Sequence, residues 1–221
     1  MVSRVAKKQG TTFQMKKWEQ EFGKEYTDRN NYTVSAMDML YKKNYGITRT
    51  GLNKLFLGNL DRSIKILEVG SNIGSQLASL QRMGFENLYG IEINKYAIER
   101  SKSSTKNINI IKGSIFDIPF KDAYFDLVFT SGVLIHINPK DIKRALKEIH
   151  RCSNKYIWVY EFYADEYENV LYRGERNLLW KADFPGIYTG IFPDLKIIKQ
   201  RFLKYLKNKN RDVMALLKKN K

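Results

Sequence analysis

Residues 66–74 read ILEVGSNIG, an apolar strand that runs into a turn flanked by two glycines. Gly70 and Gly74 lack a Cβ atom, so the backbone there can take positive φ angles and pass close beneath a ligand. Asn72, between them, tolerates positive φ better than most residues do. Apolar residues then recur on one side of residues 75–83, which predicts a helix. The stretch therefore predicts a ligand-binding loop between a strand and a helix.

Beyond this turn the chain alternates between apolar strands and amphipathic helices, the pattern of a parallel sheet with helices on both faces. The expected strands are residues 65–69, 87–93, 108–112, 124–130 and 156–162, and the expected helices are residues 75–83, residues 95–103 and a longer one from Pro139. The last strand is a continuous apolar run, as in a strand that is buried on both faces. The predicted fold class is α/β, a Rossmann-like doubly wound sheet.

The two ends of the chain depart from strict alternation. Residues 195–206 and 212–218 both read as strands joined by a Lys/Asn-rich turn, so we expect a C-terminal antiparallel hairpin on a mostly parallel sheet. Residues 1–60 are expected to form an N-terminal helical extension or cap, with helices near residues 18–22 and 35–57. Residues 61–221 then form the main domain, with an insertion on the substrate side at residues 164–193.

An acid stands at the end of the second expected strand. Glu92 lies in the sequence Gly90-Ile91-Glu92-Ile93, about twenty residues after the glycine turn. An acid in this place accepts hydrogen bonds from ribose hydroxyls, and Ile93 beside it is expected to contact the same ligand. The spacing also fits a nicotinamide dinucleotide site. The turn lacks the G-x-G-x-x-G pattern by which dinucleotide binders approach a pyrophosphate, so the sequence favours a nucleoside ligand without phosphate.

A third segment, residues 113–120 with the sequence GSIFDIPF, leaves the third expected strand and is suited to frame an adenine. Ser114 can contact the exocyclic amine, the backbone amide of Ile115 can donate to a ring nitrogen, and Phe116 can lie on the ring face. Asp117 is a competing candidate for the contact with the amine.

Residues 64–160, with these motifs in order, resemble the class I S-adenosylmethionine-dependent methyltransferases. The resemblance implies S-adenosylmethionine as the cofactor. Glu68 and Ser71 would then lie near its amino-acid moiety, with Glu68 as an anchor or as an organiser of the loop. A C-terminal antiparallel hairpin is also associated with this fold, by analogy. Methyltransferases often carry an acid where Ser114 stands, so the contact to the adenine amine departs from the family pattern.

Two further strings narrow the resemblance. Residues 18–30, WEQEFGKEYTDRN, and residues 174–184, GERNLLWKADF, resemble the methyltransferases associated with pseudaminic acid biosynthesis. This resemblance implies a sugar acid or a sugar nucleotide as the substrate. Within the first string, Tyr26 and Arg29 are predicted to reach the cofactor from above, with Arg29 on its carboxylate.

The methyl group is expected near Ser131, which ends the fourth strand, and His136 follows in the same loop. A neutral imidazole there can accept the hydroxyl proton of an acceptor, which makes His136 the candidate catalytic base. The alternative is that His136 packs on the following helix and contacts the cofactor edge.

The insertion at residues 164–193 and the residue before it are rich in aromatic residues and arginine. Arg173 and Arg176 stand three residues apart, so on a helix they would share a face and could hold a carboxylate or phosphate together, with Tyr163 as a further substrate contact. Glu175 and Asp183 offer the alternative that these arginines form only structural ion pairs.

The formal net charge of +16 is concentrated at the chain ends. Residues 1–17 carry 5 Lys/Arg and no acid, and residues 196–221 carry 10 Lys/Arg against Asp212 alone. Residues 18–195 are nearly neutral, with 24 basic and 22 acidic residues. Basic ends can hold RNA or an anionic surface, or they can be a solvated edge.

The cysteine content and the distribution of apolar residues exclude several classes of protein. The single cysteine, Cys152, excludes an intramolecular disulfide and a cysteine-rich zinc cluster, and no metal site is expected. The basic, polar residues 1–18 do not resemble a signal peptide and no run of eighteen apolar residues occurs, so a cytoplasmic protein without a membrane span is expected. Enzymes that methylate exocyclic amino groups carry an Asn-Pro-Pro-Tyr-type sequence. This sequence has none, which favours oxygen over an exocyclic nitrogen as the methylated atom.

The leading prediction is therefore an enzyme that moves a methyl group to a small anionic carbohydrate. An RNA methyltransferase that uses the basic ends, a nicotinamide oxidoreductase and a non-catalytic partner protein that binds S-adenosylmethionine are the alternatives.

Overall fold

Seven strands form one sheet in the order β3-β2-β1-β4-β5-β9-β8. The computed structural model describes residues 10–220. β1 (Lys65–Val69), β2 (Asn87–Glu92), β3 (Asn109–Lys112), β4 (Phe125–Ser131) and β5 (Ser153–Phe162) are parallel, whereas β8 (Leu195–Lys204) and β9 (Arg211–Lys219) form an antiparallel hairpin on β5. The predicted mostly parallel sheet with a C-terminal hairpin is confirmed.

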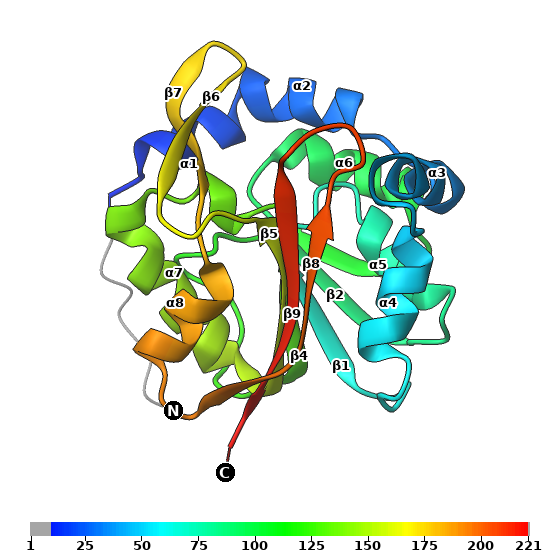
Figure 1. Cartoon of the computed structure of the whole chain (residues 1–221). Coiled ribbons are helices and arrows are strands. Elements are labelled where there is room, and N and C mark those ends of the chain that lie inside the picture. Colours follow the sequence, from blue (N-terminus) through cyan, green and yellow to red (C-terminus); the bar gives the residue numbers. More distant parts are fainter. Residues whose placement is uncertain (1–9, 221) are drawn as a thin grey trace.

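Helices cover both faces of this sheet (Figure 1). α3 (Val34–Tyr45), α4 (Arg49–Leu57) and α5 (Ser75–Gln81) pack on one face, and α7 (Pro139–Cys152) and α8 (Phe184–Ile191) pack on the other. α6 (Lys95–Ser104) lies beside β2 and β3, and the short 3-10 helix η1 (Leu134–His136) follows β4. None of the helices in residues 10–220 has the length and apolar character needed to cross a membrane.

Residues 10–60 of the N-terminal extension contain four helices, where the sequence predicted two for the extension. The first region divides into α1 (Phe13–Glu19) and α2 (Glu21–Arg29), because Gln20 between them is extended. The second divides into α3 and α4, because Gly46 takes φ 76° and the Thr48 side chain then caps the next helix by accepting from Gly51 N. α1 and α2 lie across the end of the sheet where β1 and β4 terminate (Figure 1).

The insertion at residues 164–193 holds a second, two-stranded sheet and α8. β6 (Glu168–Tyr172) and β7 (Glu175–Lys181) are antiparallel and are joined by Arg173 and Gly174, which both have positive φ. Two residues with positive φ make the turn that suits a tight hairpin. The expectation of a shared helical face for Arg173 and Arg176 is therefore wrong, because these residues belong to a hairpin.

Candidate active site

A cavity of about 460 Å³ lies at the carboxyl ends of the parallel strands. Its floor comes from the ends of β1, β2, β4 and β5, and its walls come from the N-terminal helices and the β6–β7 hairpin. The strand order reverses between β1 and β4, and ligands of open α/β sheets bind at such a switch point. The residues described below lie in or around this cavity.

The glycine turn after β1 has the backbone geometry that the sequence predicted. Gly70 takes φ 74°, and a Cβ atom there would lie 2.7 Å from Val133 Cγ2. Gly74 takes φ 81°, and Asn72 takes φ 49°. Thr27 of α2 donates its hydroxyl to Asn72 Oδ1 at 2.9 Å, so the N-terminal extension holds this turn in place.

Glu92 at the end of β2 is a buried carboxylate on the cavity wall. Its Oε2 accepts from Asn72 N at 2.8 Å, and its Oε1 accepts from the backbone amides of Ile93 at 2.7 Å and Asn94 at 2.8 Å. Burial raises the pKa of Glu92, and these three amides oppose that rise. A carboxylate has about four acceptor positions, so Glu92 keeps acceptor capacity for a ligand hydroxyl.

Two buried polar atoms beside the glycine turn lack partners among the described residues. They are Glu68 Oε2 and Ser71 Oγ, and both residues line the cavity. Burial raises the pKa of Glu68 well above its usual value, although the Arg49 guanidinium opposes this. An unpaired buried polar atom is costly, so both atoms favour a polar ligand group, and Glu68 favours a cationic one.

The segment predicted to frame an adenine also lines the cavity, with Ser114, Ile115 and Phe116. The Arg144 guanidinium lies over the Phe116 ring, 3.9 Å from its centroid. Ser114 Oγ accepts from Phe116 N at 3.2 Å, which fixes the turn. Ile93 is on the cavity wall as well.

His136 on η1 is buried, and one of its ring nitrogens has a fixed role. Its Nδ1 lies 2.6 Å from the backbone oxygen of Leu178, which can only accept, so Nδ1 carries the proton and Nε2 keeps a lone pair. Burial lowers the pKa of His136 to about 4, against the effect of the Leu178 carbonyl, so the imidazole is neutral at pH 7. Its ring packs against Trp18 and Tyr172, with centroid distances of 4.5 and 5.5 Å.

Glu161, near the end of β5, holds the loop that carries His136. Its carboxylate accepts from Val133 N at 3.2 Å and from Ile135 N at 3.4 Å. Glu161 is 1% exposed, and burial raises its pKa to about 7. The carboxyl oxygens thus accept from amides at the start of η1.

We expect Glu161→Gln to change how stability depends on pH. The folded pKa of about 7 lies above the ordinary value of 4.5, so the folded state binds more protons between these values and stability falls as pH rises through them. The free energy of unfolding of the wild type, relative to that of Glu161→Gln, should fall by about 3 kcal/mol across this range. Urea titrations at a series of pH values measure this difference. A difference that does not change with pH would contradict it.

A cluster of tyrosines around Asp212 bounds the other end of the cavity. Asp212 Oδ2 accepts from the hydroxyls of Tyr45 at 2.6 Å, Tyr160 at 2.7 Å and Tyr205 at 3.3 Å, and all three tyrosines line the cavity. Burial raises the pKa of Asp212 to about 6, although these hydroxyls oppose the rise. Arg49 Nη1 donates to the hydroxyl of Tyr41 at 2.8 Å and to Ser131 Oγ at 3.4 Å. Arg49 thus connects Ser131, at the end of β4, with the tyrosine side of the cavity.

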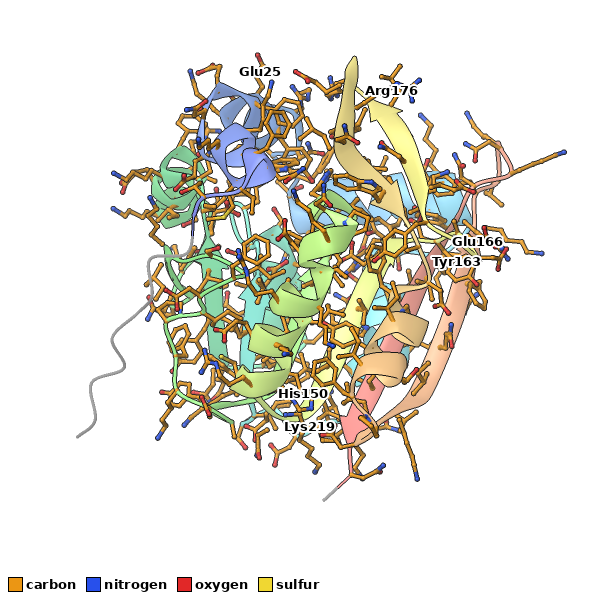
Figure 2. All side chains as sticks on the ribbon, turned by 90° about the vertical axis from the view of Figure 1, so that its left-hand side faces the viewer. Glu25, His150, Tyr163, Glu166, Arg176 and Lys219 are labelled. Carbon is orange, nitrogen blue, oxygen red and sulfur yellow. The ribbon has the colours of Figure 1, made fainter. Side chains whose placement is uncertain are left out.

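The remaining predicted residues divide into two groups. Tyr26 and Arg173 line the cavity. Arg29, Tyr163 and Arg176 are not among the residues that line it: Arg29 pairs with Glu25 on its own helix, at 3.4 Å, and the hydroxyl of Tyr163 donates to Asp165 Oδ1 at 2.8 Å. Figure 2 shows Arg176 on the β6–β7 hairpin, far from Tyr163. The ligand contacts predicted for these three residues therefore stay predictions, and Arg29 Nε and Nη2 are buried without a partner among the described residues.

Several residues at the site were not predicted from the sequence. Glu161 is the one acid within a strand that reads as an apolar run, and such an acid is a usable signal. Arg49 and the tyrosines around Asp212 give no local signal, because they are scattered along the chain and meet only in the folded protein.

Comparisons with known proteins add to this geometry. Residues 67–155 match the family described as methyltransferase domain. A crystal structure of 1,6-didemethyltoxoflavin-N1-methyltransferase from Burkholderia thailandensis superposes with a TM-score of 0.71, at 14% identity, over 98% of this chain and 93% of that one. The PH0226 protein from Pyrococcus horikoshii superposes with a TM-score of 0.60, at 17% identity, over 76% and 88% of the two chains.

The chain has the class I methyltransferase fold. Residues 67–155 match a methyltransferase domain, and the Burkholderia thailandensis structure that shares this fold holds S-adenosylhomocysteine, the demethylated form of the methyl donor S-adenosylmethionine. The residues present fit this molecule: Glu92 suits its ribose, the segment 114–116 suits its adenine, and the unpartnered Glu68 Oε2 suits its ammonium group. The sequence-based prediction of fold class and enzyme class is confirmed.

Curated relatives share part of this chain only. EEF1A lysine methyltransferase 2 of Danio rerio is 32% identical over 96 residues, which is 40% of this chain and 41% of the relative. Cycloartenol-C-24-methyltransferase of Arabidopsis thaliana is 29% identical over 125 residues, 50% of this chain and 37% of the relative. The matched segments span less than half the length of these relatives.

Proposed function

We propose that this methyltransferase transfers a methyl group from S-adenosylmethionine to an oxygen of a small anionic carbohydrate, a sugar acid or a sugar nucleotide. The observation that carries the proposal is the two-part lining of the cavity. One part holds Glu68, the glycine turn and Glu92, and the other holds His136 and the tyrosines around Asp212. A cofactor in the first part would leave the second for an acceptor.

The protein's own groups supply the rest of the chemistry. S-adenosylmethionine provides an electrophilic methyl group on a sulfonium. His136 Nε2 is positioned to take the proton of an acceptor hydroxyl, because Leu178 fixes the tautomer and Trp18 and Tyr172 fix the ring. Glu161 acts as a positioning residue, since it holds the loop of His136. Helices α1 and α2 and the β6–β7 hairpin line the cavity on the side away from the sheet.

The size and lining of the cavity support a small acceptor. Its volume of about 460 Å³ is at the lower part of the range for small-molecule sites. Tyr41, Tyr45, Tyr160 and Tyr172 offer ring faces and hydroxyls, which suit the apolar faces and hydroxyls of a sugar ring. Arg173 at the hairpin turn offers a cation for a carboxylate or phosphate. The resemblance of residues 18–30 and 174–184 to the pseudaminic acid-associated methyltransferases supports the same substrate class.

A planar nitrogen heterocycle is the second candidate acceptor. It is favoured by the aromatic walls of the cavity and by the similarity of nearly the whole chain to a toxoflavin-type N1-methyltransferase. The same tyrosine faces can stack on such a ring.

A methyl-transfer screen tests the proposal. The protein is incubated with radiolabelled S-adenosylmethionine and separate pools of sugar acids, sugar nucleotides, nitrogen heterocycles, RNA and protein lysines. We expect label in a sugar acid or sugar nucleotide, attached to oxygen. Label in RNA alone would overturn the proposal in favour of an RNA methyltransferase. Tight binding of S-adenosylhomocysteine with no label in any pool would favour a non-catalytic partner protein.

We expect ligand binding to release a proton from Glu68. Burial raises the pKa of Glu68, whose Oε2 lacks a partner among the described residues, and a ligand ammonium group beside it should lower that pKa again. Calorimetric titration with S-adenosylhomocysteine, in two buffers of different ionisation enthalpy, measures the number of protons released. Glu68→Gln should abolish the buffer-dependent part of the heat. The same proton release in Glu68→Gln would show that another group is responsible.

A further inference from the structure

One side of the molecule combines lysines with exposed apolar side chains, and we name it the α3–β8 face. The face is formed by α3, α4 and β8 with the turn that follows β8. Leu206 N, in that turn, donates to Asn44 O of α3 at 2.8 Å, and Lys199 Nζ of β8 donates to Leu55 O of α4 at 2.7 Å. The exposed residues of this face are Met39, Lys42, Lys43, Lys54, Leu55, Lys199, Leu206 and Lys207. Figure 1 shows α3 and α4 on one side of the β8–β9 hairpin.

Within the part of the chain that the structure describes, no ion pair neutralises the five lysines of this face. Residues 195–211 contain seven Lys/Arg and no acid. The acid on α3, Asp38, accepts from Thr50 N at 2.7 Å and so caps α4. The face therefore presents a local positive potential to any partner.

Large apolar side chains project among these lysines. Met39 is 69% exposed, Leu206 is 65% exposed and Leu55 is 43% exposed. Single exposed apolar residues are common, but these three stand in the same segments as lysines that form no ion pair across residues 10–220. Peripheral membrane proteins combine exposed apolar side chains with basic residues. The apolar side chains enter the boundary between lipid headgroups and acyl chains, and the basic residues contact anionic headgroups.

We infer that the α3–β8 face binds the anionic headgroups of a membrane surface. The lysines would contact the lipid phosphates, and Met39, Leu55 and Leu206 would enter the interfacial region. RNA fits this face less well, because leucine and methionine offer no flat ring for base stacking. A second copy of the chain fits less well too, since lysines along the edge strand β8 repel a like-charged edge. The inference does not depend on the proposed acceptor.

Membrane docking has a consequence for the cavity. Asn44, Tyr45 and Tyr205 line the cavity and lie beside the exposed residues of the face. A protein docked by this face holds the tyrosine end of its cavity close to the lipid surface. Acceptors attached to or dissolved in an anionic membrane would reach the cavity from there.

Vesicle sedimentation tests the inference. The full chain is mixed with vesicles of phosphatidylcholine alone or of phosphatidylcholine with phosphatidylglycerol, at low and high salt. We expect binding only with phosphatidylglycerol, decreasing as salt rises. The triple variant Lys42→Glu/Lys43→Glu/Lys207→Glu should lower the partition coefficient at least about tenfold. Leu206→Ser with Met39→Ser should lower it about tenfold at high salt as well, because that loss is apolar.

A matched control carries the same change of charge elsewhere. Lys140→Glu/Lys143→Glu/Lys147→Glu alters three exposed lysines of α7, on the other face of the sheet. This variant should keep more than half of the wild-type binding. Equal loss in both triple variants would overturn the inference, because net charge alone would then explain binding. Absence of binding to phosphatidylglycerol, or binding of a polyuridine probe in its place, would overturn it too.

Discussion

Glu92→Ala should lower the affinity for S-adenosylhomocysteine about a hundredfold or more. The ligand would lose hydrogen bonds to a charged acceptor, each with a net value of about 1.5–3 kcal/mol. The backbone amides of Asn72, Ile93 and Asn94 would also lose their shared acceptor, so the glycine turn would be less well ordered. Isothermal titration calorimetry measures the affinity directly.

Two further variants separate the causes of this loss. Glu92→Gln keeps the shape and one acceptor oxygen, and we expect a loss of about tenfold. Glu99→Ala is the matched control, because Glu99 is an exposed acid on α6 that pairs with Lys102 at 2.7 Å, outside the cavity. Unchanged affinity in Glu92→Ala would show that this carboxylate does not contact the ligand.

His136→Asn should lower the rate of methyl transfer by about a hundredfold to a thousandfold, the range for loss of a general base. Asparagine can still donate to the Leu178 carbonyl but has no ring nitrogen with a free lone pair. The affinity for S-adenosylhomocysteine should change less than about threefold, because the prediction concerns the acceptor proton. The rate is measured with the acceptor found in the methyl-transfer screen.

The chain offers a matched histidine for this experiment. His150 lies 2.9 Å from Asp194 and stacks on Phe192, and it is not among the described residues that line the cavity. His150→Asn should therefore keep the wild-type rate. A His136→Asn rate close to that of His150→Asn would contradict the role of His136 as base and would leave it as a packing residue between Trp18 and Tyr172.

Local patterns in the sequence predicted the backbone geometry of the glycine turn and the position of Glu92 beside it. The glycines of the turn are needed for positive φ, and Glu92 must follow a strand at a set distance, so both features can be recognised from adjacent residues. The C-terminal hairpin was predictable for the same reason: two strands and a polar turn are adjacent in the chain.

The acceptor half was less predictable. The prediction for Arg173 and Arg176 assumed a helix, whereas Arg173-Gly174 is a hairpin turn, and a glycine between two strand-like runs is the sequence signal for such a turn. Arg29 pairs with Glu25 on α2, as i to i+4 spacing allows, and its contact with the cofactor stays a prediction. The cluster around Asp212 depends on residues from α3, β5 and the β8–β9 hairpin, so only tertiary packing brings it together.

The most direct test of the central claim is calorimetric titration of the wild-type protein with S-adenosylhomocysteine and, separately, with NAD. The glycine turn without a pyrophosphate pattern, the buried Glu92 and the unpartnered Glu68 all predict saturable binding of S-adenosylhomocysteine and no binding of NAD. Binding of NAD without binding of S-adenosylhomocysteine would contradict the assigned cofactor and the function built on it.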